Sequence, residues 1–69
     1  MFQNYKILRR PEVESITGLS RSSIYAKMDD GTFPQPIKLS VRSVGWLEHE
    51  IQGWLKNRMS ATRKEKNYD

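Results

Sequence analysis

The fold of this 69-residue chain is decided by the stretch Thr17-Gly18-Leu19-Ser20-Arg21-Ser22-Ser23-Ile24-Tyr25. Gly18 is suited to end one helix in the left-handed conformation, which glycine adopts without steric cost. Ser20 is a favoured N-cap for the next helix. Leu19 before this cap and Ile24 four residues after it form a hydrophobic staple. Two short helices joined by a tight glycine-containing turn predict a helix-turn-helix.

Proline and glycine residues on both sides of this stretch predict where the two helices begin and end. Pro11 suits a first helical turn, so we expect the first helix over residues 11–17. Gly31 closes the second helix, which we expect over residues 21–30. Pro34 and Pro36 then prevent the helix from resuming. Both helices are too short to be stable alone, so packing must hold them.

Two runs with a period of two follow the helices. Ile37 and Leu39 alternate with Lys38, and Val44 and Trp46 alternate with Gly45. This pattern predicts a two-stranded hairpin over residues 37–46 whose four apolar side chains form one buried face. Because two strands alone are marginally stable, the hairpin must lie on the helices.

The last helix has the clearest pattern of all. Its apolar positions form a single stripe that should supply most of the core: Leu47, Ile51, Trp54, Leu55 and Met59. Trp46 and Trp54 could also stack on bases, but their core-periodic positions favour burial. Residues 60–69 alternate charges, and we expect a disordered tail there. The sequence therefore predicts one domain over residues 1–59, mainly α with a small β-hairpin.

Composition narrows the function. Twelve Lys and Arg against eight Asp and Glu give a net charge of +4 and a pI near 9.7. A small domain this basic is typical of nucleic-acid binding. The chain has no cysteine and no apolar run long enough for a signal peptide or a membrane span. We therefore expect a cytoplasmic protein.

The exposed face of the second helix is suited to the major groove of DNA. Ser22, Ser23 and Ala26 are small enough for close approach, and Arg21 in the first turn can bond to guanine. A solvated helix face would show the same small polar residues. The candidate DNA-binding residues of this helix are Ser20, Arg21, Ser22, Ser23, Tyr25 and Lys27.

Two further basic sites extend the candidate surface. Arg42 at the hairpin tip, its neighbour Ser43 and Lys38 on the face away from the core would reach the phosphate backbone or a minor groove. Arg9 and Arg10 precede the first helix and could straddle a phosphate; the alternative is a solvated pair.

Catalysis and metal binding are not expected. His49 is the only histidine, and its place in a polar helical turn predicts exposure. A zinc site needs three or four suitably spaced ligands, which the sequence does not offer. Glu48 and Glu50 point in different directions, so they cannot work as an acid–base pair. We expect no enzyme activity and no cofactor.

Six short motifs in fixed order carry a resemblance to a known family. They lie between about Ile7 and Arg58: RPEV at 10–13, TGLSRSSIY at 17–25, GTFP at 31–34, IKL at 37–39, VGW at 44–46 and EI with WL at 50–55. Together they resemble the AlpA family, which comprises small prophage-encoded DNA-binding regulators. That family is similar in turn to phage excisionases and to the DNA-binding half of MerR-type regulators.

The resemblance implies a winged helix-turn-helix fold of three helices and a two-stranded wing. It implies a recognition helix over residues 20–30 and a wing over residues 37–46. At positions that match the family's motifs, the resemblance implies that Arg21, Ser22, Ser23 and Tyr25 face DNA. It also implies that Lys38 and Arg42 belong to the wing.

These observations favour a sequence-specific, double-stranded DNA-binding transcriptional regulator of prophage type. One alternative is an excisionase that bends DNA beside an integrase, and another is a non-catalytic adaptor that binds a protein partner. Because one short helix reads few base pairs, further copies of the chain on repeated half-sites are expected partners, as are an integrase or RNA polymerase.

Overall fold

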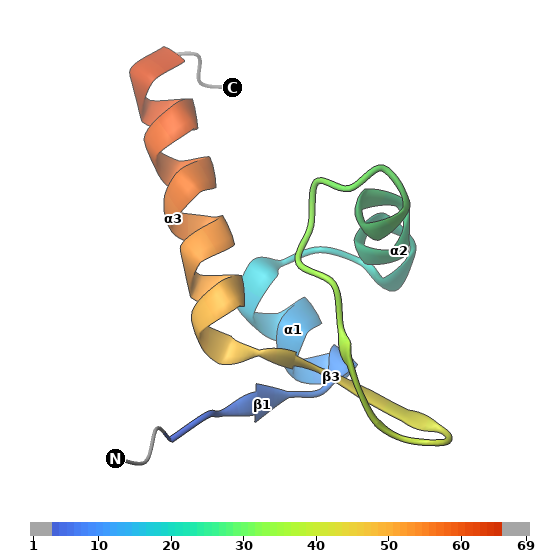
Figure 1. Cartoon of the computed structure of the whole chain (residues 1–69). Coiled ribbons are helices and arrows are strands. Elements are labelled where there is room, and N and C mark those ends of the chain that lie inside the picture. Colours follow the sequence, from blue (N-terminus) through green and yellow to red (C-terminus); the bar gives the residue numbers. More distant parts are fainter. Residues whose placement is uncertain (1–3, 66–69) are drawn as a thin grey trace.

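The computed structural model describes residues 4–65 and contains three helices and three strands (Figure 1). In chain order these are β1 (Ile7–Leu8), α1 (Arg10–Thr17), α2 (Arg21–Asp29), β2 (Ile37–Ser40), β3 (Ser43–Leu47) and α3 (Glu48–Glu65). The prediction of three helices in a mainly α fold with some β structure is confirmed.

The tight turn between α1 and α2 forms as its residues predict. Gly18 has φ 74° and its backbone N–H donates to the Glu14 carbonyl at 2.8 Å. Ser20 caps α2 by accepting a hydrogen bond from the Ser23 backbone N–H at 3.2 Å. Gly31, with φ 80°, follows the C-terminus of α2. The C-terminus of α1 and both ends of α2 therefore coincide with these local signals.

The core takes one buried side chain from each of six segments. These residues are all less than 5% exposed: Leu8, Val13, Ile24, Phe33, Trp46 and Ile51. They come from β1, α1, α2, the segment between α2 and β2, β3 and α3. β2 contributes none, and all four of its residues are exposed.

The sheet has three antiparallel strands in the order β1-β3-β2, so the prediction of two strands was wrong. Ile7 pairs with Leu47, and Leu8 pairs with Trp46. β1 contains only two residues, which is too short for any alternation to be visible in the sequence. Its pairing to β3 buries Leu8 beside Trp46.

The predicted single buried face of the hairpin was also wrong. Ile37 pairs with Gly45, and Lys38 pairs with Val44. Directly paired residues point to the same side of a sheet, so Ile37 lies on the face opposite Trp46, while Lys38 lies on the Trp46 side. The register of the hairpin, which the sequence pattern does not reveal, placed the two apolar runs on different faces. Ile37 is accordingly 39% exposed, and Val44 is 38% exposed although it lies on the Trp46 side.

Helix α3 is longer than expected and its apolar stripe is only partly buried. It continues to Glu65, so residues 60–65 are helical where we expected a disordered tail; residues 66–69 lie outside the described part. Ile51 is fully buried, Trp54 and Leu55 are half-buried, and Met59 is 47% exposed. Met59 is therefore not a core residue, because the helix has by then passed beyond the rest of the molecule (Figure 1).

Candidate nucleic-acid interface

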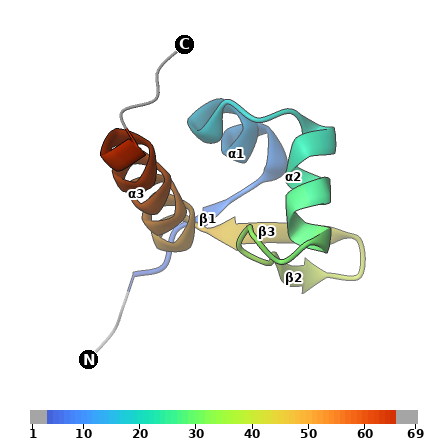
Figure 2. The same ribbon diagram turned by 90° about the horizontal axis from the view of Figure 1, so that it is seen from above.

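The two elements expected to touch DNA lie on the same side of the molecule. Figure 2 shows α2 and the β2–β3 hairpin on one side of the molecule, α3 on the other side and α1 between α2 and α3. The fold therefore brings together two segments separated in sequence by the residues 30–36, which we call the linker.

Helix α2 presents its first turns to solvent. Ser20, Arg21 and Ser22 are exposed, and Ser23 is half-buried. The hydroxyl of Ser20 also donates to that of Ser23 at 3.1 Å. These short side chains are thereby held close to the backbone, and the helix surface remains accessible.

Arg21 lies against an aromatic ring in this surface. Its guanidinium carbon is 5.8 Å from the centre of the Tyr25 ring, one helical turn away. Such a cation–π contact restrains a side chain that would otherwise be free in solvent. Tyr25 itself is 39% exposed. Arg21 and Tyr25 thus form one basic and aromatic patch on α2.

The C-terminal end of α2 contains an acidic residue that stabilises the following turn. The Asp30 carboxylate accepts hydrogen bonds from the Thr32 hydroxyl at 2.6 Å and the Thr32 backbone N–H at 3.0 Å. These two bonds, with the nearby positive charge of Lys27, lower the pKa of Asp30 below its ordinary 3.8. Lys27 is half-buried, and it is less accessible than the residues of the first turn.

The hairpin carries its basic residues in exposed positions. Lys38 and Arg42 are both exposed, and Ser43 is half-buried. Val41, beside Arg42 in the turn, is 86% exposed. The tip is therefore free to approach another molecule.

The two arginines before α1 differ in their surroundings. Arg9 is exposed, and its backbone N–H donates to the Glu12 carboxylate at 2.9 Å. The Arg10 Nε donates to the Glu14 carboxylate at 2.9 Å in a half-buried ion pair. A phosphate would have to share Arg10 with Glu14, whereas the Arg9 side chain is more accessible.

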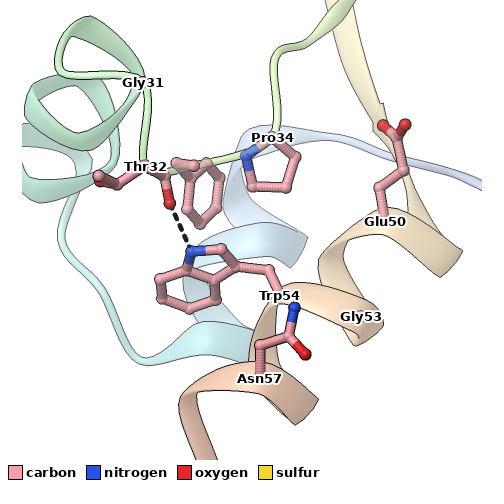
Figure 3. A pocket seen from close by; sticks show the side chains of 8 residues that line it. Gly31, Thr32, Pro34, Glu50, Gly53, Trp54 and Asn57 are labelled. Carbon is pink, nitrogen blue, oxygen red and sulfur yellow. Dashed lines mark hydrogen bonds between the residues drawn. The ribbon is translucent and has the colours of Figure 1, made fainter. Parts of the chain in front are cut away.

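A groove of about 460 Å³ lies between the linker and α3, on the side of the linker where Trp54 lies (Figure 3). The Trp54 indole N–H donates to the Thr32 carbonyl at 2.7 Å, and its ring meets Phe33 edge-on with 4.9 Å between ring centres. Sequence reasoning missed Phe33, which lies in an irregular segment without periodicity. The expectation of a buried Trp46 is confirmed, and that of Trp54 is confirmed in part, since it borders this groove.

His49 is exposed as predicted and lies 6.2 Å from the Tyr5 ring, measured between ring centres. Within residues 4–65, no three His, Cys, Asp or Glu side chains come together as a metal site. No helix among the described residues has the length and apolar character needed to cross a membrane.

Comparison with known proteins gives three matches. The family model described as "Prophage CP4-57 regulatory protein (AlpA)" matches residues 6–59. The chain is 44% identical over 59 residues to "DNA-binding transcriptional activator AlpA" of Escherichia coli K12, which covers 77% of this chain and 84% of that protein. It is 38% identical over 59 residues to "Uncharacterized protein ORF88" of Enterobacteria phage P4, which covers 86% of this chain and 67% of that protein.

Proposed function

Because the chain belongs to the AlpA family of prophage regulatory proteins, we propose that it is a sequence-specific, double-stranded DNA-binding transcriptional regulator with no catalytic step. In this proposal α2 is the recognition helix and enters the major groove. The β2–β3 hairpin is the wing and contacts the backbone or the minor groove. The proposed activity places the protein in the cytoplasm with the DNA.

One observation carries the proposal: helix α2, which bears the Arg21–Tyr25 patch, and the β2–β3 hairpin, which bears exposed cations, lie on the same side of the molecule (Figure 2). An arginine in the first turn of a groove-binding helix can donate two hydrogen bonds to a guanine edge. The small side chains of Ser22 and Ser23 let the helix backbone come close to the base pairs. Lys38 and Arg42 supply the charge that contacts to phosphate need.

The Escherichia coli relative is named a transcriptional activator, which favours transcriptional activation for this chain over the excisionase alternative. Both activities would use the same protein surface. A single α2 reads few base pairs, so we expect two or more copies on repeated half-sites. RNA polymerase would be the further partner of an activator, and an integrase that of an excisionase.

The first experiment selects bound fragments from bacterial genomic DNA and measures affinity for the selected duplex. In the proposed role, Arg21→Ala lowers affinity for this duplex by about 1–3 kcal/mol and relaxes the preference at one base pair. Equal losses on the selected and a random duplex would instead assign Arg21 to phosphate. Failure to enrich any sequence would contradict the proposal.

The second experiment tests the wing by salt titration on one duplex. Each phosphate contact contributes about 0.9 to the slope of log affinity against log salt. Replacing Lys38 and Arg42 with alanine should therefore flatten this slope by up to about two units without changing the preferred sequence. The matched control, Lys56→Ala with Arg58→Ala, removes the same charge from exposed positions of α3 and should change the slope much less. Equal slopes for both double variants would reject the wing.

A further inference from the structure

The linker between α2 and the wing is bonded to two indole rings from different elements. Trp54 of α3 donates its Nε1–H to the Thr32 carbonyl at 2.7 Å. Trp46 of β3 donates its Nε1–H to the Pro34 carbonyl at 3.1 Å. The side chain between these two carbonyls, Phe33, is 4% exposed and packs edge-on against Trp54. Three consecutive linker residues are thus fixed to β3 and α3.

The same linker is bonded to the end of α2. The Thr32 backbone N–H donates to the Lys27 carbonyl at 2.9 Å. The Gln35 side-chain amide donates to the Met28 carbonyl at 3.0 Å. A displacement of Thr32 would therefore be transmitted directly to the last turn of α2.

The wing is connected to the linker through Trp46, and it is connected to α3 through the chain itself. Trp46 belongs to strand β3 of the wing and is fully buried, and α3 begins directly after β3. Helix α2 itself makes its main contact with α1. Beside the shared core, in which Ile24 of α2 lies with Trp46 and Ile51, the linker is therefore a hydrogen-bonded connection between α2 and the unit formed by β3 and α3.

We propose that Trp54 is a positioning residue for DNA recognition: through its bond to Thr32 it sets the orientation of α2 relative to the wing. This inference rests on the proposed function. Reading a specific site requires α2 and the wing to fit one duplex together, and a binding site must hold its groups to within about 0.5 Å. Binding to random DNA depends mainly on charge and tolerates a change in that orientation.

The position of Trp54 separates this role from core packing. The indole is only half-buried and borders the open groove in Figure 3. Water can reach the Thr32 carbonyl from this groove, so a lost indole donor can be replaced there and little folding stability is lost. A water molecule, however, does not fix Thr32 to α3. Loss of the bond should therefore affect alignment more than folding.

The test replaces only the donor atom. Chemical synthesis of the 69-residue chain with Trp54→3-benzothienylalanine keeps the size and shape of the ring and puts sulfur in place of the N–H. The matched control is Ile51→Val, a change in the core one turn earlier on α3 that leaves the Trp54 indole N–H and its bond to Thr32 in place. Affinities of all three proteins are measured for the genome-selected duplex and for a random duplex at the same salt concentration.

The donor-free protein should bind the selected duplex up to about tenfold more weakly, the amount that one net hydrogen bond is worth. Its affinity for the random duplex should stay unchanged. Ile51→Val should keep the parent ratio between the two duplexes, even if its melting temperature falls further. This pattern assigns the lost discrimination to the indole N–H and not to stability.

Two outcomes would overturn the inference. A folded donor-free protein with the parent ratio would show that the bond does not align α2. A donor-free protein that no longer folds, by circular dichroism, would show that the bond holds the whole fold. If the parent itself prefers no duplex, the proposed function fails instead, and that result is distinct from both.

Discussion

Helix α2 and the β2–β3 hairpin form the two halves of the proposed interface, yet they are fixed by different means. The helix is capped by Ser20, ended before Gly31 and anchored by the fully buried Ile24. In the hairpin, β2 buries no side chain, and β3 provides the anchor through Trp46. Local residues therefore define the helix, whereas the hairpin depends on contacts with distant parts of the chain.

The largest expected effect is on the anchor of the hairpin. Trp46→Ala removes a fully buried ring and its bond to Pro34, and it should cost about 3–5 kcal/mol of unfolding free energy. This is comparable with the whole stability of a small domain. Urea unfolding followed by circular dichroism measures it. Ile24→Ala is the matched change in α2 and should cost about 2–5 kcal/mol. A stable Trp46→Ala protein would contradict the view that β3 anchors the hairpin.

The next-largest expected effect is a loss of stability when the close packing of β3 against β1 is disturbed. A Cβ atom at Gly45 would lie 2.4 Å from the Ile7 side chain and 3.1 Å from the Leu8 carbonyl. Gly45→Ala should therefore destabilise the protein by about 1–3 kcal/mol. Gly53 in α3 is the control, because a Cβ there meets nothing within 4 Å. Gly53→Ala should stabilise the helix by up to about 1 kcal/mol. Thermal melting of both variants checks the opposite signs, and equal signs would refute the argument.

A smaller loss of stability is expected when the N-cap of α2 is removed. Ser20→Ala removes the side chain that accepts from the Ser23 N–H and should cost about 1 kcal/mol. Ser22→Ala, at an exposed position inside the helix, is the control and should change stability by less than about 0.5 kcal/mol. Chemical denaturation distinguishes the two. Similar values would mean that packing, and not the cap, sets the start of α2.

The smallest effect concerns the other end of α2 and depends on pH. Because the hydrogen bonds from Thr32 lower the pKa of Asp30, the charged carboxylate stabilises the folded protein above pH 3.8. That contribution is lost as the pH falls below 3.8 through the folded-state pKa. An NMR titration of the side-chain carboxyl should show the lowered pKa, and Thr32→Ala should return it toward 3.8. An unchanged pKa in the variant would assign the shift to another cause.

The sequence predicted α2 better than the hairpin for a physical reason. Gly18, Ser20 and Gly31 act on backbone groups within a few residues, so their effects can be read from neighbours in the chain. Ile37 and Val44 also belong to runs in which every second residue is apolar. The face of the sheet that each side chain occupies, however, depends on the register of the hairpin. That register pairs Ile37 with Gly45, and no short-range signal encodes it.

The residues of the candidate surface also differ in whether their surroundings can be predicted from neighbours in the sequence. The exposed positions of Arg21, Ser22 and Arg42 follow from the pattern of apolar residues around them. Lys38 is exposed as well, but the prediction that it lies on the face away from the core was wrong, because the register places it on the Trp46 side. The ion pair that occupies Arg10 also has a local signature, since Glu14 lies one helical turn away. The bonds of the linker have none, because Trp54 reaches Thr32 across 22 residues.

The sequence by itself determined the three helices, the ends of α1 and α2, the basic charge and the family. These properties depend on composition, on caps and on a periodicity that repeats within a few residues. Only the tertiary structure decided the third strand, the face on which each hairpin residue lies and the attachment of the linker to two tryptophans. Each of these joins residues distant in sequence, and such contacts form only when the whole core excludes water and brings their partners together.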